Sequence, residues 1–563
     1  MQLQMDLPTS FGRTAYQYGE RSSGETHGVV LTKPHIVELI LDLVGYTPER
    51  SLASLRLLEP AAGTGAFLVP AVRRLLASAR RESVKPSELD KAITTYDVDP
   101  THVDATRSAL RKVLLEHDVP GRTANRLAEH WVREGDFLLT PEKPFDFVVG
   151  NPPYIRIEQL APDLQAEYRR RYSSLFDRAD LYVAFIERGL DLLKPTGTLS
   201  FICADRWILN KYGAPLRKKL ADNFRMHVYI DLHRASPFES EVIAYPSIFA
   251  ISPGKTERVV VASMASAAPD ECLSIQRHLS QQQPVHHPGV SLSTYDSWFQ
   301  GDEPWVLSSP EHLELLRSLE ARFQPIEADG MTKVRIGVAT GSDKVFIVPK
   351  GVDIEPDRLV PLVKREDIEN GRIRDAQRYV INAFETDGRL VDLKQYPRLA
   401  RYFRTHEDAL RKRHVAQNKT TGWFRTIDRV YPELVPVPKL LVPDIAGSNE
   451  VVFEEGHYHP HHNLYFVTST AWDMEVLGGL LSSRVALFFI WSYAVKMRGG
   501  YLRFQAQYLR RIRLPHPEDL PKKLTGALRT AFRQRDFAKL DELALAAYGL
   551  RTLPRFDFVD TRR

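Results

Sequence analysis

The chain has 563 residues, which is too long for one compact domain and suits two or three. Hydrophobic residues make up 43% and charged residues 26%, the ordinary composition of a soluble globular protein, and the net charge of +5 says little by itself. No run of about 18 apolar residues and no signal-peptide pattern occurs, so we expect a cytoplasmic protein without a membrane partner.

Short apolar runs alternate with amphipathic stretches in the first half of the chain. Helical patterns fall at 34–46, 65–81, 101–117 and 180–193, and strand patterns at 55–58, 92–97, 130–134, 145–150, 197–203, 226–232 and 246–251. This alternation predicts an α/β fold with a mainly parallel sheet, whose ligand crevice lies at the carboxyl ends of the strands.

The pattern weakens near residues 264–297, which lack clear periodicity. We therefore predict a first domain over 1–263, a linker over 264–297 and a second domain over 298–563. In the second domain the strand patterns are scattered and two long helical patterns cover 476–494 and 522–549. These features predict a mixed α+β domain.

A glycine-containing loop, EPAAGTGAFL, follows the strand at 55–58 and opens the next helix. Gly63 and Gly65 allow a sharp turn and a close backbone approach to a ligand. The position of a third glycine is taken by Leu68, which argues against a dinucleotide or P-loop site. Glu59 could contact the ammonium of an amino-acid-like ligand. The alternative for the glycine loop is a tight strand–helix turn, and the alternative for Glu59 is a solvated strand end.

Acidic residues follow the next two strand patterns. Asp97 is the candidate for gripping a ribose diol, and Asp99 is the candidate cap of the helix after it. Asp136 could accept the amino group of a bound adenine with Phe137 against the ring. A turn Asp beside a core Phe is the alternative interpretation.

The strand pattern at 145–150 ends in the tetrapeptide NPPY. The side-chain oxygen of Asn151 and the backbone carbonyl of Pro152 can accept hydrogen bonds from a planar amino group, and the prolines at 152 and 153 fix that carbonyl in place. Tyr154 offers a ring face on which a base can stack. Alone, NPPY could be a turn; its position after the glycine loop and the two acidic strand ends favours a substrate clamp.

The segments EPAAGTGAFL, YDVDP, GDFLL and NPPY together resemble the S-adenosylmethionine-dependent DNA amino-methyltransferases of the gamma type, to which the TaqI adenine methyltransferase belongs. The resemblance extends to 26–40, 180–208 and 238–251, and it covers roughly residues 20–255. It implies a Rossmann-like methyltransferase domain with a seven-stranded sheet, and a target-recognition domain after it.

The resemblance also implies site residues. Asn151, Pro152, Pro153 and Tyr154 would be catalytic, with Tyr154 and Phe238 stacking on the target base. S-adenosylmethionine would be bound by Thr32, Glu59, Pro60, Ala61, Gly63, Gly65, Asp97, Asp136 and Phe137.

A base inside a duplex cannot reach such a pocket, so the enzyme must flip it out and hold the DNA backbone. Two basic segments with interleaved aromatic residues, at 398–425 and 491–515, are candidates for this contact. The residues that we select as DNA contacts are Arg411, Arg413, Lys496, Arg498, Arg503 and Arg510.

Histidines at 457, 459, 461 and 462 could suggest a metal. No acidic or cysteine partner has a recognisable ligand spacing, and methyl transfer needs no metal, so we predict no metal site. Cys203 and Cys272 are far apart in the chain, and we expect no disulfide.

The leading hypothesis is a site-specific DNA adenine-N6 methyltransferase of a restriction–modification or related defence system. N4-cytosine, RNA or protein-glutamine methylation, and a DNA-binding specificity subunit with an inactive scaffold, are the alternatives. The partner would be double-stranded DNA, with any cognate nuclease on a separate protein because no nuclease motif is found. We expect a monomer.

Overall fold

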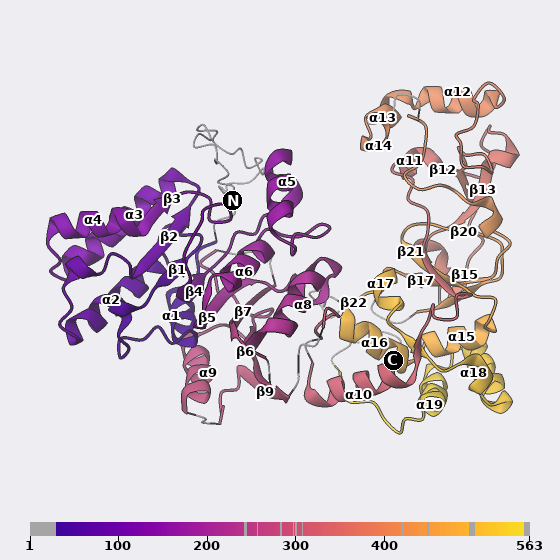
Figure 1. Ribbon diagram of the computed structural model, residues 1–563. Helices are drawn as coiled ribbons and strands as arrows, with labels where there is room; N and C mark the ends of the chain where they lie inside the picture. The colour runs from indigo at the N-terminus through magenta and orange to yellow at the C-terminus, as the bar shows by residue number, and fades with distance from the viewer. Residues whose placement is uncertain are drawn as a thin grey trace, which may run out of the picture. The chain divides into compact units, whose positions relative to one another are not determined.

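The computed structural model describes residues 30–240, 245–255, 257–281, 284–296, 298, 301–306, 308–417, 422–446, 450–494 and 502–556. Two compact units divide the chain, Met1–Val306 and Leu307–Arg563. Figure 1 shows the first unit in indigo to magenta and the second in red to yellow.

The first unit is built on a nine-stranded sheet of order β3-β2-β1-β4-β5-β7-β6-β8-β9. The strands from β3 to β5 are parallel, and β7 is antiparallel to both β5 and β6. The bounds are β1 Leu57–Glu59, β2 Ile93–Asp97, β3 Val132–Glu134, β4 Phe145–Gly150, β5 Leu193–Ala204, β6 Phe224–Asp231, β7 Pro246–Pro253, β8 Arg258–Met264 and β9 Val290–Asp296.

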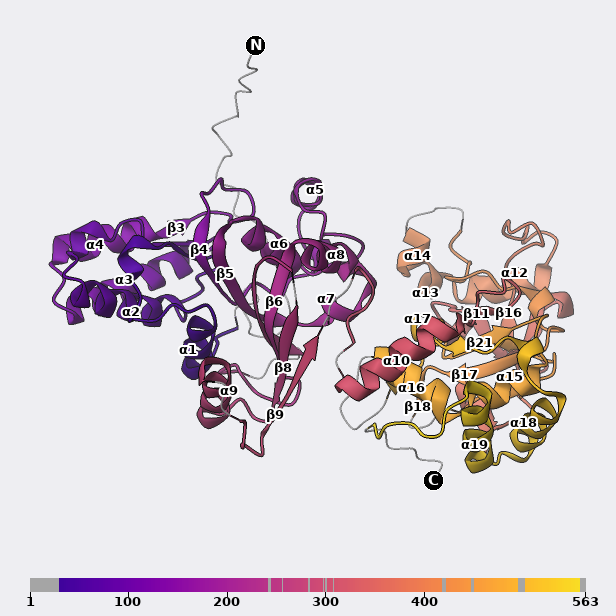
Figure 2. The same ribbon diagram turned by 60° about the horizontal axis from the view of Figure 1, so that its bottom comes forward.

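Helices cover both faces of this sheet (Figure 2). They are α1 Pro34–Leu43, α2 Leu68–Arg81, α3 Pro100–Glu116, α4 Gly121–Trp131, α5 Pro162–Arg171, α6 Tyr182–Asp191, α7 Arg206–Leu209, α8 Ala214–Asn223 and α9 Pro269–Gln281. One continuous apolar core joins α1 to α4 and α9 with the sheet. Strand β4 is buried along its whole length, because helices cover it on both sides.

The start of α3 agrees with the sequence prediction. The Asp99 carboxylate accepts a hydrogen bond from the Thr101 amide, and Pro100 occupies the first helical position, where its missing N–H costs nothing. Asp99 is thus the helix cap, as the sequence predicted.

Two predictions about this unit are wrong. The sheet has nine strands rather than seven, and the predicted linker at 264–297 contains α9 and β9. The boundary therefore falls after Val306. The segment lacks a clear periodicity because β9 is an edge strand with mostly exposed or half-exposed side chains, and α9 buries only three residues.

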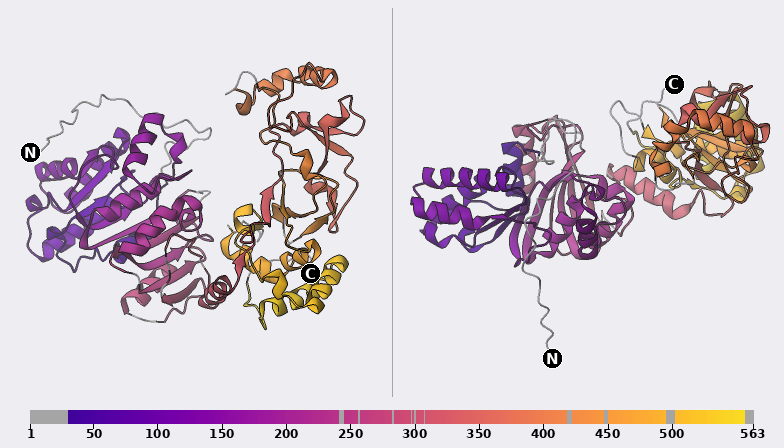
Figure 3. Two further views of the ribbon diagram at one scale, coloured as in Figure 1. Left: turned by 45° about the vertical axis from the view of Figure 1, so that its right-hand side comes forward. Right: turned by 90° about the horizontal axis from the view of Figure 1, so that it is seen from above.

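The second unit combines small sheets with helices, as a mixed α+β domain should (Figure 3). One four-stranded sheet has the order β11-β21-β17-β19, and another has the order β12-β16-β13-β20; two-stranded pairs are β10-β23, β14-β15 and β18-β22. The strands are β10 Gln324–Pro325, β11 Lys333–Ile336, β12 Ile347–Pro349, β13 Leu359–Val363, β14 Ile368–Glu369, β15 Arg372–Ile373, β16 Arg378–Ile381, β17 Lys439–Pro443, β18 Ile445–Ala446, β19 Val452–Glu454, β20 His459–Pro460, β21 Leu464–Thr468, β22 Leu502–Arg503 and β23 Arg513–Leu514.

Each of the two long helical patterns of this unit is a pair of helices. The first breaks at two serines into α15 Met474–Leu481 and α16 Arg484–Tyr493, bent by 59°, and Ser483 caps α16. The second breaks at Arg535, in left-handed conformation, into α18 Lys522–Gln534 and α19 Phe537–Tyr548. The other helices are α10 Pro310–Arg322, α11 Asp343–Phe346, α12 Pro397–Thr405, α13 Glu407–Arg411, α14 His414–Gln417 and α17 Ala506–Leu509.

No single helix of the described residues has the length and apolarity needed to cross a membrane; only the bent pair α15 and α16 passes by length and composition. Both helices of this pair are largely buried inside the second unit.

Candidate active site at the carboxyl end of the sheet

The predicted site residues converge because β2, β1 and β4 are neighbours in the sheet. The loops after β1 and β4 touch: a Cβ at Gly150 would lie 3.4 Å from Pro60 Cδ and 3.7 Å from Glu59 Cγ. Gly150 also has a φ of 153°, which L side chains rarely adopt. Glycine at this position therefore lets the NPPY loop leave β4 directly beside Glu59-Pro60.

The glycine loop is held by the strand and helix beside it. Asp97 Oδ2 accepts a hydrogen bond from the Gly63 amide at 2.8 Å, and Thr106 Oγ1 donates to the Gly63 carbonyl at 3.0 Å. Gly65 has a φ of 89°, and a Cβ there would lie 3.3 Å from Thr106 Cγ2. Sequence reasoning missed Thr106, because it lies on α3 more than 40 residues after the loop and matches no motif.

Glu59 is buried, with 1% of its surface exposed, and its Oε2 has no hydrogen-bond partner among the described residues. Burial raises the pKa of Glu59 well above its usual range, and the charge of Asp97 adds to this effect. An isolated buried carboxylate is costly, so this position favours a bound group that brings positive charge or a donor. The alternative of a solvated strand end does not fit the burial.

Asp136 and Phe137 are engaged within the protein. Asp136 accepts hydrogen bonds from the Tyr168 hydroxyl at 2.5 Å and from the Leu138 amide at 2.8 Å. Burial raises the pKa of Asp136. The Phe137 ring is 2% exposed and packs against Phe185 at 5.5 Å, which is the core position of the alternative interpretation.

The side-chain nitrogen of Asn151 is held by hydrogen bonds, whereas its side-chain oxygen has no hydrogen-bond partner among the described residues. Its Nδ2 donates to the Val30 carbonyl at 3.0 Å and to Thr32 Oγ1 at 3.3 Å. A backbone carbonyl can only accept, so this contact decides which end of the amide is nitrogen. The Oδ1 atom is buried and accepts no hydrogen bond within the described part of the chain. The site thus contains a preoriented acceptor without a donor.

Aromatic rings surround the end of the NPPY loop. Tyr154 meets Phe238 edge to face, with ring centroids 6.3 Å apart, and Tyr182 at the same centroid distance. Burial raises the pKa of Tyr154 well above its usual range, and its hydroxyl has no partner among the described residues.

Phe238 is placed by the segment that also holds Asn151. Thr32 and Phe238 form an antiparallel bridge, with the Lys33 amide donating to the Pro237 carbonyl at 3.0 Å and the Glu239 amide to the Leu31 carbonyl at 2.9 Å. Residues 30–33 therefore bind both the side chain of Asn151 and the backbone around Phe238. Sequence reasoning predicted a site role for Thr32 but not this connection.

The six residues predicted to contact DNA differ in their exposure and in their partners. Arg413 donates to the carbonyls of Thr340, Leu410, Trp423 and Arg425, and burial lowers its pKa. Arg413 is half-buried, and these bonds tie its guanidinium to carbonyls of the second unit. A DNA contact by Arg413 stays a prediction. A basic cluster in a sequence does not reveal which guanidinium groups bind backbone carbonyls.

The remaining predicted contacts are half exposed or undescribed. Arg411, Arg503 and Arg510 form ion pairs with Glu407, Asp444 and Glu327, respectively, while keeping 50%, 39% and 48% of their side chains exposed. Lys496 and Arg498 lie outside the described residues. These five stay predictions.

The structure brings an acidic residue to the histidine segment. The ligand atoms of Asp343, His461 and His462 lie within 4.8 Å of one another, so the three could hold a metal ion by distance. Asp343 already accepts from Thr340 at 2.6 Å and contacts His461 at 2.9 Å, and Lys364 Nζ lies 3.6 Å from the same carboxylate. The sequence did not show the proximity of Asp343, which is about 120 residues away. The absence of a metal stays a prediction.

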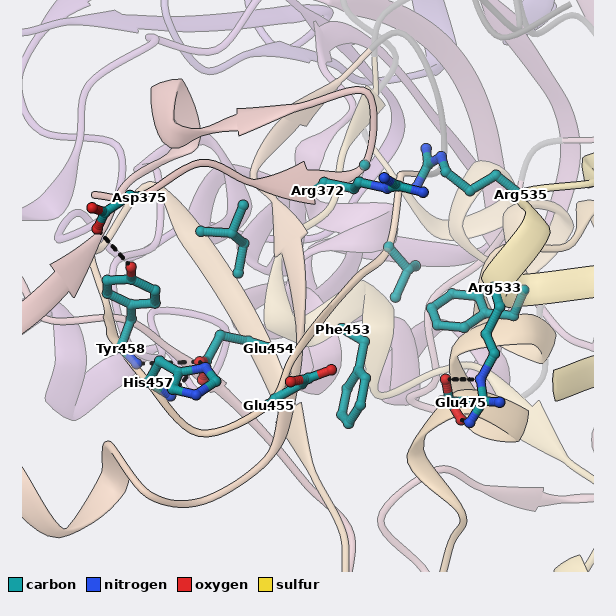
Figure 4. A pocket seen from close by; sticks show the side chains of 14 residues that line it. Arg372, Asp375, Phe453, Glu454, Glu455, His457, Tyr458, Glu475, Arg533 and Arg535 are labelled. Atoms are coloured by element: carbon teal, nitrogen blue, oxygen red, sulfur yellow. Dashed lines mark hydrogen bonds and ion pairs between the residues drawn. The ribbon is translucent and has the colours of Figure 1, made fainter. Parts of the chain in front are cut away.

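A pocket of the second unit is lined by opposite charges (Figure 4). Arg372, Arg533 and Arg535 lie at one side of this cavity of about 520 Å³, and Asp375 and Glu454 lie at the other. Arg533 pairs with Glu475, and Glu454 pairs with buried Lys439. Two of the lining charges are thus paired within the second unit, and no lining residue belongs to the NPPY loop.

Comparisons with known proteins identify the family of this chain. The Eco57I restriction-modification methylase family model matches residues 84–238. The type II methyltransferase M.BstVI of Geobacillus stearothermophilus is 46% identical over 88% of this chain and 91% of its own length. M.PaeR7I of Pseudomonas aeruginosa is 43% identical over 93% of this chain and 92% of its own, and M.XhoI of Xanthomonas vasicola is 42% identical over 95% of this chain and 100% of its own.

The chain belongs to the type II restriction–modification methyltransferases. Its fold is similar to that of the type IIL restriction–modification enzyme MmeI, solved in complex with DNA, with a TM-score of 0.60 at 13% identity over 93% of this chain and 74% of that one.

The methyltransferase uses S-adenosylmethionine, which supplies the methyl group when it is bound. The buried, unpartnered Glu59 Oε2 and the Gly63–Gly65 loop beside Asp97 suit a ligand with a cationic amino-acid end and a ribose. The residues present therefore fit the cofactor that the resemblance implied.

Proposed function

We propose that this methyltransferase transfers a methyl group to the N6 amino group of an adenine flipped out of double-stranded DNA, as the modification enzyme of a restriction–modification system. The observation that carries the proposal is the unpartnered Asn151 Oδ1, whose orientation is fixed by the bond from Nδ2 to the Val30 carbonyl. Such an acceptor complements an exocyclic amino group.

The chemistry requires the nitrogen lone pair to point at the methyl donor. The amino group of adenine is a poor nucleophile because its lone pair is delocalised into the ring. Hydrogen bonds from its two N–H groups to Asn151 Oδ1 and to the Pro152 carbonyl favour a pyramidal nitrogen. The nitrogen is positively charged after methyl transfer, so its proton leaves without a dedicated base.

The rings near Asn151 suit an extruded base. Unstacking a base from a duplex costs a few kcal/mol, and stacking on aromatic side chains offsets about 1–3 kcal/mol per base. Tyr154 and Phe238 provide these rings in the proposal. The proposed contacts of the second unit to the DNA backbone are Arg411, Lys496, Arg498, Arg503 and Arg510.

A base-modification map tests the proposal. The protein is expressed in a methylation-free bacterial host, and modified bases are read across the genome. We expect N6-methyladenine in one short sequence context, and its loss with Asn151→Ala at unchanged affinity for S-adenosylmethionine. We expect this variant to lower the methylation rate at least about 100-fold, the effect of removing one preorganised polar group at a reacting centre.

Two results would contradict the proposal. N4-methylcytosine in a fixed context would move the target to cytosine. Unmodified DNA from folded, cofactor-binding protein would move the substrate away from DNA bases.

A further inference from the structure

Three exposed cations lie on the segments next to Asp180 in the first unit. Arg156 lies two residues after Tyr154 and forms an antiparallel bridge with Asp180, Arg206 opens α7, and Lys211 follows that helix. The Tyr212 hydroxyl, next to Lys211 in the chain, donates to Asp180 Oδ2 at 3.1 Å. We name Arg156, Arg206 and Lys211 the Asp180 rim.

The electrostatics of Asp180 agree with this grouping. Burial raises the pKa of Asp180, and the hydrogen bond from Tyr212 and the charges of Arg156 and Arg206 oppose the rise. Both guanidinium groups thus act on one carboxylate, although they come from loops about 50 residues apart.

The rim lies beside the proposed base clamp. Tyr182 shares a hydrogen bond of 2.7 Å with Tyr212, and its ring packs against that of Tyr154. The Leu181 amide also donates to the Ile155 carbonyl at 2.7 Å. The chain after NPPY is therefore bound to the loop that carries Asp180.

The cations of the rim lack acidic partners within ion-pair distance in the described chain. Arg206 lies over the ring of Tyr245 and Lys211 over the ring of Phe176, each at 5.7 Å from the centroid. Phe176 itself is 45% exposed. The lysines of the nearby helix α8 differ, since Lys218 and Lys219 pair with Asp222 and Asp191. Asp180 is half-buried and accepts the Tyr212 hydroxyl, so the outward charge of the rim is positive.

We propose that the Asp180 rim binds backbone phosphates of the DNA strand next to the extruded base. A nucleotide that leaves the stack rotates about its own backbone, and holding the flanking phosphates stabilises that state. Unpaired cations beside the clamp, two of them over aromatic rings, suit this contact. The inference rests on the proposed function in taking a base in DNA as the target. It places contacts to the DNA backbone on the first unit, whereas the sequence indicated backbone contacts only in the second.

Equilibrium DNA binding by the full-length protein tests the inference. A labelled duplex of about 30 base pairs is titrated at several salt concentrations, because each phosphate contact contributes about 0.9 to the slope of log affinity against log salt. The test variant is Arg156→Ala/Arg206→Ala/Lys211→Ala. The control variant removes three cations that are already paired with acids in the same unit: Arg126→Ala, Arg170→Ala and Lys218→Ala.

We expect the test variant to bind at least about 10-fold more weakly than the control, with a slope smaller by about 2 to 3, and to retain its affinity for S-adenosylmethionine. Equal affinities and slopes for the two variants would overturn the inference. A wild-type protein that binds no DNA would instead contradict the proposed function. A test variant that no longer binds the cofactor is replaced by the three single substitutions, each expected to lower the slope by about 1; no change in any of them would also overturn the inference.

Discussion

Thr32 contacts Asn151 and Phe238, the two residues that the proposal assigns to the target base. The resemblance assigned it to the cofactor, but its hydroxyl accepts a hydrogen bond from Asn151 Nδ2, and its backbone pairs with that of Phe238. Thr32 is therefore a positioning residue for the amide acceptor in the proposed reaction.

We expect Thr32→Val to lower kcat about fivefold, the value of one lost hydrogen bond of about 1 kcal/mol, with little change in the affinity for S-adenosylmethionine. Thr32→Ser keeps the hydroxyl and should restore kcat. Single-turnover kinetics and calorimetric titration of the cofactor measure the two effects. If cofactor affinity fell while the rate at saturating cofactor stayed unchanged, Thr32 would be a cofactor contact only.

The residue scale also shows what motifs leave undecided. The order of the glycine loop, Asp97 and NPPY predicted the residues at the crevice, because strand ends of a parallel sheet share one edge. The orientation of the Asn151 amide depends on Val30, about 120 residues away. The pKa of Glu59 is raised by burial and also by the charge of Asp97, about 40 residues away. The bond from Arg413 to the Thr340 carbonyl, 73 residues away, was hidden in the same way.

At the scale of elements, helix α3 supports the cofactor loop. Asp99 caps its start, and Thr106 on the same helix holds the Gly63 carbonyl. Local chemistry was sufficient to predict this cap, since a side chain one residue before a proline-initiated helix needs no distant partner.

We expect Asp99→Ala to lower the free energy of unfolding by about 1 kcal/mol, because the Thr101 amide loses its acceptor. Asp104→Ala, at an exposed position within the same helix, is the matched control and should change stability by less than about 0.5 kcal/mol. Chemical denaturation monitored by circular dichroism compares the two variants. Equal stabilities would show that the cap contributes nothing.

Elements that depend on distant partners were predicted less well. Among the described residues, strand β9 is paired only with β8. Its mostly exposed side chains left the segment without a clear strand pattern. The long helical patterns at 476–494 and 522–549 had the right period throughout, but Ser483 and Asp536 each cap a second helix. The hydrophobic period shows which face of a helix is buried, but it does not show where one helix ends and a second begins along a different axis.

At the scale of the whole molecule, the two compact units allow stability and cofactor binding to be separated. Lys439 is fully buried in the second unit, where its ammonium binds Glu454 at 2.5 Å and the Tyr458 carbonyl at 3.1 Å. Burial lowers the pKa of Lys439, and the contact with Glu454 opposes this effect.

We expect Lys439→Met to destabilise the second unit by about 3–5 kcal/mol, because it leaves the buried Glu454 carboxylate without its cation. Lys439→Met/Glu454→Gln removes both charges and should be less destabilised. Scanning calorimetry measures the loss, and cofactor titration should show unchanged affinity in the first unit. A single variant as stable as the wild type would show that the pair contributes nothing.

The sequence alone determined the alternation of strands and helices in the first unit, the residues at its crevice and the type of chemistry they suit. These features follow from local periodicity and from motifs whose members lie on consecutive elements. Only the tertiary structure decided the nine-strand sheet, the end of the first unit after Val306, the orientation of the Asn151 amide and the bridge between Arg156 and Asp180. Each of these depends on contacts between segments far apart in the chain, which local patterns do not record.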